Sequence, residues 1–287
     1  MKPKVLVVMP VRDEEKLVRY ALNSLVKQTV KPDLMLLVDD GSTDKTPRIL
    51  KSYARKYEWI RYLRLERAGG RNVGAAVARA LILGVMYAID ILGFEWEYLL
   101  KVDADTIYER DYILKLLGKF NERERLGVAS GVTINESVNP EHARGPGLML
   151  RKIVWDQVRL KPIIGWDSYI VFKAQMLGWE TGSFKGIKMY TLRKTSASEG
   201  DIARGKYKQG YASGLLGYTL PIALGRSLKL SVTYRNFRIF PNFMAGYISA
   251  KVGGSDIVEA ELKQWVKRTQ CLRLINILTL RRLSLVS

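Results

Sequence analysis

Three short apolar runs in this sequence end in residues that can do chemistry. The runs, with the residues that follow them, are 5–9 with Pro10, 34–38 with Asp39-Asp40, and 98–102 with Asp103-Ala104-Asp105. Each run has the length of a buried strand, and the carboxyl ends of parallel strands meet at one edge of a sheet. An aspartate after a strand is often only a helix cap. Capping alone accounts poorly for three such ends, so we predict one crevice that gathers them.

The two aspartates that follow the third apolar run indicate a metal site. Asp103 and Asp105 can reach the same small region if the chain turns after the strand. Two neighbouring carboxylates repel each other unless a cation lies between them. Oxygen ligands select a hard divalent ion, Mg²⁺ or Mn²⁺, and Mg²⁺ usually completes its shell with substrate phosphates. The pair therefore predicts a metal-bound diphosphate substrate.

Strand-like and helix-like segments alternate through the first half of the chain. Two further strands are predicted at 60–65 and 127–134, and helices are predicted at 13–28, after Thr43-Asp44, at 72–91 and at 111–121. This alternation predicts an α/β fold, with a mostly parallel central sheet flanked by helices. The three run ends would then lie at the edge where such sheets bind their ligands.

The charge of the chain is unusual for an otherwise ordinary globular composition. The 287 residues include 47 Lys and Arg against 28 Asp and Glu, a net charge of +19. Such a surface attracts an acidic partner: nucleic acid, anionic lipid or a phosphorylated substrate. One cysteine and one histidine are too few for a disulfide within the chain or a Cys/His zinc cluster.

The composition changes after about residue 194. The longest uncharged stretch, 209–225, has 17 residues, whereas a membrane-spanning helix needs about 20. It is expected to be a buried helix, a membrane-surface element or a re-entrant one. Residues 256–283 show an apolar stripe at helical spacing with basic residues around it. Such a helix either packs on the main domain or lies on an anionic membrane surface, so we expect a helical C-terminal extension.

The order of three motifs resembles family 2 glycosyltransferases with the GT-A fold. The motifs are Pro10-Val11-Arg12-Asp13-Glu14, Val38-Asp39-Asp40-Gly41-Ser42-Thr43-Asp44 and Asp103-Ala104-Asp105. The resemblance covers residues 4 to about 185, and the tail is similar, more weakly, to membrane-associated members. It implies metal-dependent, inverting transfer of a sugar, in the manner of a hexosyltransferase. The donor would be a nucleotide-diphosphate sugar and the acceptor lipid-linked or a polysaccharide.

The resemblance also implies a role for each matching position. It gives nucleotide-sugar contacts to Pro10, Arg12, Glu14, Asp39, Asp40, Arg79 and Asp103, and it gives Mn²⁺ or Mg²⁺ to Asp103 and Asp105. Arg71 and Lys101 are further cation candidates for the diphosphate. Asp13 and Ala80 each stand where the family usually has Asn, which leaves a polar contact at Ala80 in doubt.

Inverting transfer needs a base that takes the proton from the acceptor hydroxyl. The family places an aspartate for this in a short motif after D-x-D, and Asp167 in Trp166-Asp167 is the candidate. A helix N-cap would also explain Asp167, and an acceptor phosphate would need no base. Trp166 either stacks on a sugar face or belongs to the core.

The departing diphosphate needs its charge neutralised as the bond breaks. The chain has no histidine after His142, so the available cations are Arg193, Lys194, Arg204, Lys206 and Lys208. Of these, Arg204 and Lys206 are candidate contacts to the diphosphate or acceptor. A solvated basic linker is the alternative interpretation of this segment.

We therefore expect three regions. They are a nucleotide-sugar-binding half at 1–120, an acceptor-binding half at 121–200, and a basic amphipathic helical tail at 201–287 on an anionic membrane surface. The apolar run near the N-terminus is too short for a signal-peptide core. The expected location is cytoplasmic and peripheral, on the cytoplasmic face of the membrane.

Two other functions stay open from the residues alone. A basic nucleic-acid-binding protein would fit the charge, but none of the common nucleic-acid-binding patterns is present and no nucleic-acid partner is expected. A nucleotidyltransferase on a related fold would show a glycine-rich loop after the first strand. The sequence has Pro10-Val11-Arg12-Asp13-Glu14 there, which also excludes a Rossmann oxidoreductase.

Overall fold

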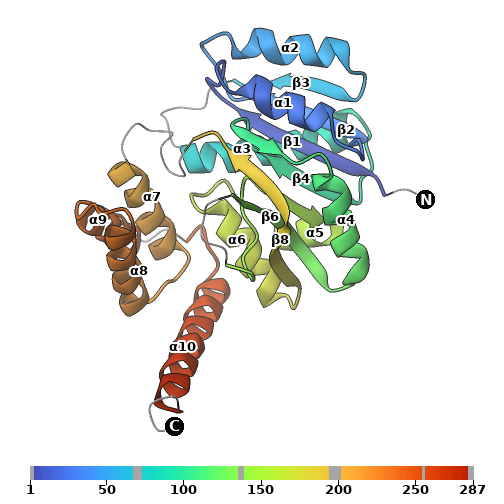
Figure 1. The fold of residues 1–287 in the computed structure, drawn as a ribbon. Coiled ribbons are helices and arrows are strands. Elements are labelled where there is room, and N and C mark those ends of the chain that lie inside the picture. The colour runs from blue at the N-terminus through green and yellow to red at the C-terminus, as the bar shows by residue number, and fades with distance from the viewer. Residues whose placement is uncertain (1–2, 67–72, 135–138, 194–201, 254–255, 284–287) are drawn as a thin grey trace. The chain divides into compact units, whose positions relative to one another are not determined.

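The computed structural model describes residues 3–66, 73–134, 139–193, 202–253 and 256–283. The chain divides into two compact units, Met1–Lys194 and Thr195–Ser287 (Figure 1). A single sheet runs through the first unit. The expected halves at 1–120 and 121–200 both contribute strands to this sheet.

The sheet of the first unit is mixed, with its parallel part at the N-terminal side of the chain. Its strands are β1 (Val5–Val11), β2 (Leu34–Asp39), β3 (Ile60–Arg64), β4 (Tyr98–Val102), β5 (Thr106–Tyr108), β6 (Leu126–Thr133), β7 (Gly147–Arg151) and β8 (Glu180–Thr191). Their order is β3-β2-β1-β4-β7-β6-β8-β5. The first four run parallel, as do β6 and β8, while β7 is antiparallel to β4 and β6. The sequence had predicted five of these strands, all of which are present.

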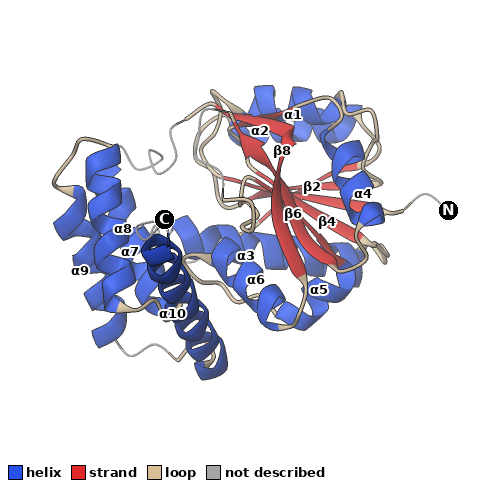
Figure 2. Ribbon diagram, turned by 60° about the horizontal axis from the view of Figure 1, so that its bottom comes forward, coloured by secondary structure: helices blue, strands red, loops and turns tan. Residues whose placement is uncertain are grey.

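Helices cover both faces of this sheet (Figure 2). They are α1 (Val18–Val26), α2 (Thr46–Lys56), α3 (Val73–Met86) with a π-helical turn (Tyr87–Ile91), α4 (Tyr112–Glu122), α5 (Lys152–Val158) and α6 (Trp166–Met176). Val5, Val7 and Met9 of β1 share a core with α1, α2 and α4. On the other face, Gly84 lets α3 approach β1 and β2, because a Cβ there would lie 2.9 Å from Val8. Both faces of β1 are thus buried, which explains its unbroken apolar run.

The first helix begins later than the apolar spacing predicted. The sequence predicted a helix from residue 13, but α1 begins at Val18. Asp13 has a φ of 51°, a left-handed conformation that cannot lie inside an α-helix. The segment between β1 and α1 is instead a loop that hydrogen-bonds to the loop after β2.

The second unit is helical in its described part. Its helices are α7 (Ile202–Leu215), α8 (Leu220–Thr233), α9 (Ile239–Val252) and α10 (Ala260–Leu283). Gly210 and Gly246 bring α7 and α9 into backbone contact, since a Cβ on Gly210 would lie 1.9 Å from the Phe243 carbonyl oxygen. The uncharged stretch 209–225 is divided between α7 and α8, so it is not a single buried helix. Among the described residues, no helix combines the length and apolar content needed to cross a membrane.

Candidate active site

The loops after β1 and β2 bind each other through reciprocal hydrogen bonds. The Asp13 amide donates to Ser42 Oγ, and the Thr43 amide donates back to Asp13 Oδ1 at 2.8 Å. The Glu14 amide donates to Thr46 Oγ1. A carboxylate oxygen accepts as an Asn amide oxygen would, and both residue types tolerate a left-handed backbone. This explains why Asp can stand at position 13, where the family usually has Asn.

Two adjacent aspartates at the end of β2 have different surroundings. Asp39 is fully buried, and its carboxylate accepts bonds from the Ser42 amide, the Tyr62 hydroxyl and Arg64. These protein groups occupy both of its oxygens. Its carboxylate thus holds the ends of β2 and β3 together, and its contact with a nucleotide stays a prediction.

Asp40, by contrast, lies between two arginines at the edge of the sheet. Arg79 Nη1 of α3 is 3.2 Å from Asp40 Oδ1, and Arg12 Nη1 is 3.8 Å from Oδ2. Pro10, Arg12, Asp40 and Arg79, all predicted as nucleotide contacts, thus lie on neighbouring elements. Ala80 is fully buried in α3, so the polar contact in doubt there is absent.

The acids after β4 are each already held by a cation of the first unit. Lys101, whose side chain is buried in β4, forms an ion pair with Asp103. Its ammonium lies 4.8 Å from the ring centroid of Trp166, which begins α6 and is itself buried. The structure therefore brings Trp166 to D-x-D. The ammonium contact and the burial favour the core interpretation of Trp166 over sugar stacking.

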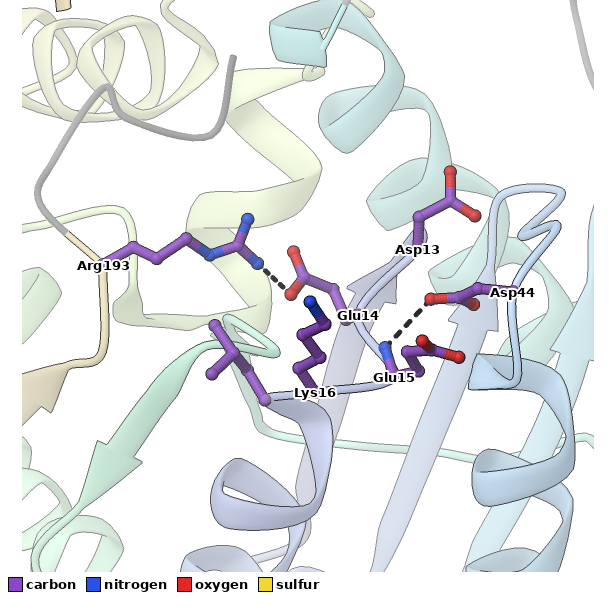
Figure 3. Close-up of a pocket in the computed structure, with 7 residues that line it drawn as sticks. Asp13, Glu14, Glu15, Lys16, Asp44 and Arg193 are labelled. Atoms are coloured by element: carbon purple, nitrogen blue, oxygen red, sulfur yellow. Dashed lines mark hydrogen bonds and ion pairs between the residues drawn. The ribbon is translucent and has the colours of Figure 1, made fainter. Parts of the chain in front are cut away.

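Arg193 bridges the second of these acids to the loop after β1. Its Nε is 3.4 Å from Asp105 Oδ2, and its Nη2 forms an ion pair with Glu14 (Figure 3). Burial is the main cause that raises the pKa of Glu14, to about 7, and the charges of Asp105 and Asp103 add to this rise. Burial and Asp103 likewise raise the pKa of Asp105. Glu14, Asp103 and Asp105 therefore form one cluster of mutually repelling acids.

A cavity of about 380 Å³ opens beside this cluster. Seven residues from the β1–α1 loop, the β2–α2 loop and the end of β8 line it: Asp13, Glu14, Glu15, Lys16, Leu17, Asp44 and Arg193 (Figure 3). Arg193 reaches across to Glu14 in this view. Because two of the sequence motifs contribute to the lining, the cavity belongs to the predicted crevice.

The candidate base lies in the first turn of α6. Helix α6 begins at Trp166 with Gly165 as its N-cap, so the N-cap alternative for Asp167 is wrong. Asp167 Oδ1 accepts the Ser168 amide at 2.8 Å. The other oxygen lies against Gly145, where a Cβ would be only 3.1 Å away. A glycine at 145 thus leaves room for this carboxylate.

Several predicted cations do not join the described site. Arg71, Lys194 and the side chain of Arg204 lie outside the described residues. Lys206 is nearly fully buried in α7, with its ammonium 4.5 Å from the Tyr234 ring centroid. It is therefore not part of a solvated linker, and its contact with a diphosphate or acceptor stays a prediction.

Sequence reasoning missed the link between Glu14 and the acids after β4. The motif placed Glu14 beside a nucleotide, and Arg193 was one of five cations offered for the diphosphate. The arrangement in which Arg193 joins Glu14 to Asp105 depends on where β8 ends in the sheet. No local pattern in the sequence shows that position.

The acids fit a divalent cation that shares its shell with a substrate. Among the described residues, no three or more His, Cys, Asp or Glu side chains form a ready metal cage. Asp103 and Asp105 would supply two oxygens, and phosphates would supply others, as Mg²⁺ sites commonly require. The raised pKa of Asp105 marks an excess of negative charge that a divalent ion would relieve.

Comparison with known proteins gives the same family. The Streptococcus pneumoniae glycosyltransferase GlyA is 31% identical over 47% of this chain and 18% of its own length. The poly-beta-1,6-N-acetyl-D-glucosamine synthase of Staphylococcus epidermidis is 25% identical over 64% of this chain and 38% of its own. The chain thus spans less than half the length of these curated relatives.

A solved structure is similar over most of the chain. It is the mannosyltransferase PcManGT from Pyrobaculum calidifontis, in complex with GDP-Man and Mn²⁺. The TM-score is 0.61 at 15% sequence identity, and the match covers 89% of both chains. The GT-A fold expected from the sequence is confirmed by this likeness. Residues 6–178, more than half of the chain, match glycosyl transferase family 2, and the protein belongs to that family.

Proposed function

We propose that the protein transfers a sugar from a nucleotide-diphosphate sugar to an acceptor hydroxyl, with inversion and with Mn²⁺ or Mg²⁺. The observation that carries the proposal is the acid cluster of Glu14, Asp103 and Asp105 beside a cavity, in a family 2 chain. The family favours this function over a nucleic-acid-binding protein or a nucleotidyltransferase.

The donor nucleotide would lie along the ends of β1, β2 and α3. Asp40 is the acid that would accept hydrogen bonds from the base or ribose, since its oxygens lie at the edge of the sheet. Arg12 and Arg79 fix its orientation. Asp39 would hold the end of β2 in place.

The diphosphate would lie between D-x-D and Arg193. A divalent ion held by Asp103 and Asp105 would neutralise charge on the departing diphosphate. Arg193 is the cation that we assign to the same task, because it lies between Glu14 and Asp105 and its Nε makes no hydrogen bond within the described residues. Arg193 forms ion pairs with Glu14 and Asp105 in the free protein. When a donor binds, Arg193 would leave these carboxylates and pair with the phosphates of the donor.

The acceptor would approach from the side of α6. Asp167 is the base in this proposal: its carboxylate takes the proton from the acceptor hydroxyl as the hydroxyl oxygen attacks the sugar. Gly145 gives that carboxylate its space. A polysaccharide acceptor is supported by the name of the Staphylococcus epidermidis relative, and a lipid-linked acceptor is supported by the basic second unit.

The second unit supports a peripheral place on the cytoplasmic face of a membrane. Residues 202–253 contain eight Lys or Arg and no Asp or Glu. The cytoplasmic leaflet carries a negative surface potential, which attracts such segments.

Binding of donors tests the proposal directly. Thermal unfolding is measured with UDP-, GDP-, TDP- and CMP-sugars, each with and without Mn²⁺. A donor at 100 times its dissociation constant should stabilise the fold by about 2.7 kcal/mol. We expect one nucleotide class to raise the melting temperature only with metal, and an Asp105→Ala variant to lose that shift. A metal-independent shift in both proteins would contradict the role of D-x-D.

The base is tested separately by Asp167→Asn. This change should abolish transfer to a hydroxyl and leave donor binding intact, because Asp167 lies on the acceptor side. Asp156→Asn, at an exposed position in α5, is the control and should keep full transfer. If Asp167→Asn left transfer unchanged, Asp167 would only stabilise α6, or the acceptor group would be a phosphate, which needs no base.

A further inference from the structure

Helix α8 buries three small residues most deeply, and several of its large apolar residues are exposed. Ala223, Ser227 and Ser231 are buried, whereas Leu228 is 54% exposed and Val232 is 69% exposed. A helix that packs on a water-surrounded domain normally has the opposite arrangement, with its apolar stripe on the core. Leu224 and Leu230 of α8 pack partly buried against the core of the second unit, whereas Leu228 and Val232 are exposed and point away from it.

Packing within the second unit fixes this orientation. The buried hydroxyls are satisfied inside the helix, since Ser227 donates to the Leu224 carbonyl and Ser231 to the Ser227 carbonyl. Ala223 packs in a core cluster with Phe243 and Tyr247 of α9. The large side chains of α9 already fill the space beside the small residues of α8. Turning α8 so that Leu228 and Val232 replaced the small residues there would overpack that core.

The exposed apolar residues of α8 continue into the turn that follows it. Leu228 and Val232 are four residues apart and so are neighbours on the surface of α8, and Leu220 is exposed in its first turn. Phe237, in the turn between α8 and α9, is 82% exposed. Single exposed apolar residues are normal. Leu228, Val232 and Phe237, here called the α8 stripe, together form an exposed apolar surface in the described part of the second unit.

Basic residues accompany the α8 stripe. Lys229 is exposed on α8, and Arg235 and Arg238 are exposed on either side of Phe237. No acid occurs between residues 202 and 253. The partner of this face must therefore take up apolar side chains and also carry negative charge.

We propose that the α8 stripe and its flanking basic residues insert into the anionic surface of a lipid bilayer. Apolar residues of such a helix enter the boundary between headgroups and acyl chains, while Lys and Arg contact the phosphates. A second copy of the chain would bring like charges together. A nucleic acid would leave Leu228, Val232 and Phe237 without an apolar partner. An anionic bilayer can bind both the apolar side chains and the basic residues of this surface.

This inference deepens the proposed membrane location and names the residues that make the contact. Its test measures lipid binding without donor, metal or acceptor. A failure would therefore leave the proposed transfer reaction untouched. Conversely, an inactive enzyme could still bind vesicles through α8.

The experiment is co-sedimentation of the full chain with vesicles. Vesicles of phosphatidylcholine alone are compared with vesicles in which phosphatidylglycerol replaces part of it. We expect strong binding only to the second kind. Val232→Ser and Phe237→Ser should each weaken binding about tenfold. Lys229→Gln, Arg235→Gln and Arg238→Gln should each weaken it about fivefold, and added salt should act in the same direction.

Matched controls come from the first unit. Ile91 is 68% exposed, a fraction similar to the 69% of Val232. Lys185 is also exposed. Ile91→Ser and Lys185→Gln should bind vesicles like the parent. All of these variants should keep the melting temperature of the parent, because exposed substitutions change stability little. Equal binding by the α8 variants and the controls would overturn the proposal.

A second measurement reports insertion itself. The chain has one cysteine, Cys271, which is exposed. In a Cys271→Ser background, Val232→Cys carries an environment-sensitive dye, and Ile91→Cys carries it as the control. Anionic vesicles should shift the emission of the dye at 232 and leave that at 91 unchanged. Shielding of the dye at 232 that grows with protein concentration without lipid would indicate a second copy and refute the bilayer.

Discussion

The two units of this chain place charge and apolar surface in opposite ways. In the first unit, buried charges have partners of opposite sign: Asp39 accepts from Arg64, and Lys101 pairs with Asp103. In the second unit, the buried ammonium of Lys206 lies over the Tyr234 ring. Burial is the main cause that lowers its pKa, and the charge that adds to this effect is the like charge of Arg226. The first unit also keeps its apolar runs inside the sheet, while α8 leaves Leu220, Leu228 and Val232 exposed.

This difference agrees with the proposal that the first unit binds a donor and the second unit meets a bilayer. A crevice for a charged donor needs acids and cations held at fixed positions, which the ends of β1, β2 and β4 supply. A surface that meets a bilayer needs exposed apolar groups and an excess of one charge. Reaction and location are thus assigned to different segments, and changes in one unit should leave the other function intact.

The largest effect that separates the units is expected from Asp105→Ala. Transfer should fall about a thousandfold or more, because a metal supplies several kcal/mol of charge stabilisation in the transition state. Vesicle binding should not change. Turnover with the donor found by thermal shift measures the first effect and co-sedimentation the second.

The control for this variant is Asp90→Ala, at an exposed aspartate of the same unit. It should keep both activities. An active Asp105→Ala enzyme would refute the metal role. Loss of vesicle binding in Asp105→Ala would remove the separation between the units.

The converse effect is expected from Gly210→Ala in the second unit. The new Cβ would meet the Phe243 carbonyl, so α7 and α9 must separate. We expect a loss of about 3 kcal/mol from the stability of the second unit, in line with overpacking, together with loss of vesicle binding. Donor-induced stabilisation of the first unit should persist, and hydrogen exchange resolves the two units.

Gly225→Ala is the matched control in the same unit. A Cβ at 225 meets nothing within 4 Å, so the change should stabilise α8 by up to about 1 kcal/mol. If Gly210→Ala were as stable as Gly225→Ala, the close approach of α7 and α9 would be disproved.

A comparison within the first unit separates support from binding. Asp39→Ala should cost about 3 kcal/mol of stability, because it strips a buried carboxylate from Tyr62, Arg64 and the Ser42 amide. Asp40→Ala should cost less stability but weaken donor binding more. Chemical unfolding and donor titration measure the two quantities. The reverse order would return the nucleotide contact to Asp39.

The sequence predicted the parts of the fold whose signals are local. Strands β1, β2 and β4 are buried on both faces, so each forms an unbroken apolar run. Strands β5, β7 and β8 were not predicted. β5 has three residues, β7 has five and follows a Pro/Gly-rich stretch, and β8 mixes buried and exposed positions without strict alternation. The predicted start of α1 was wrong, because Asp13 is held in a loop by hydrogen bonds with the loop after β2, which is distant in the sequence.

The site follows the same rule. D-x-D and Asp40 were recognisable because each directly ends an apolar run. The different roles of Asp39 and Asp40 depend on Tyr62, Arg64 and Arg79, which only the folded sheet brings near. For α8, a sequence stripe shows that two sides differ but not which side meets the protein. The residues of α9 decide that.

The smallest expected effect is a pH dependence from Lys206. Burial, followed by the charge of Arg226, lowers the pKa of Lys206 from 10.5 to about 8. Between these values the unfolded chain binds more protons, so the free energy of unfolding should rise with pH there and stay flat below. Lys206→Met should remove the rise. At pH 7 it should stabilise the second unit by about 1 kcal/mol, since the lost contact with Tyr234 offsets part of the gain.

Lys229→Met, at an exposed position on α8, is the control for this experiment and should keep the rise of the parent. Unfolding by urea at a series of pH values measures all three proteins. If the rise persisted in Lys206→Met, desolvation of that ammonium would not be its source. The buried ammonium of Lys206 would then cost the second unit no stability. The contrast between the two units would depend only on the exposed apolar residues of α8.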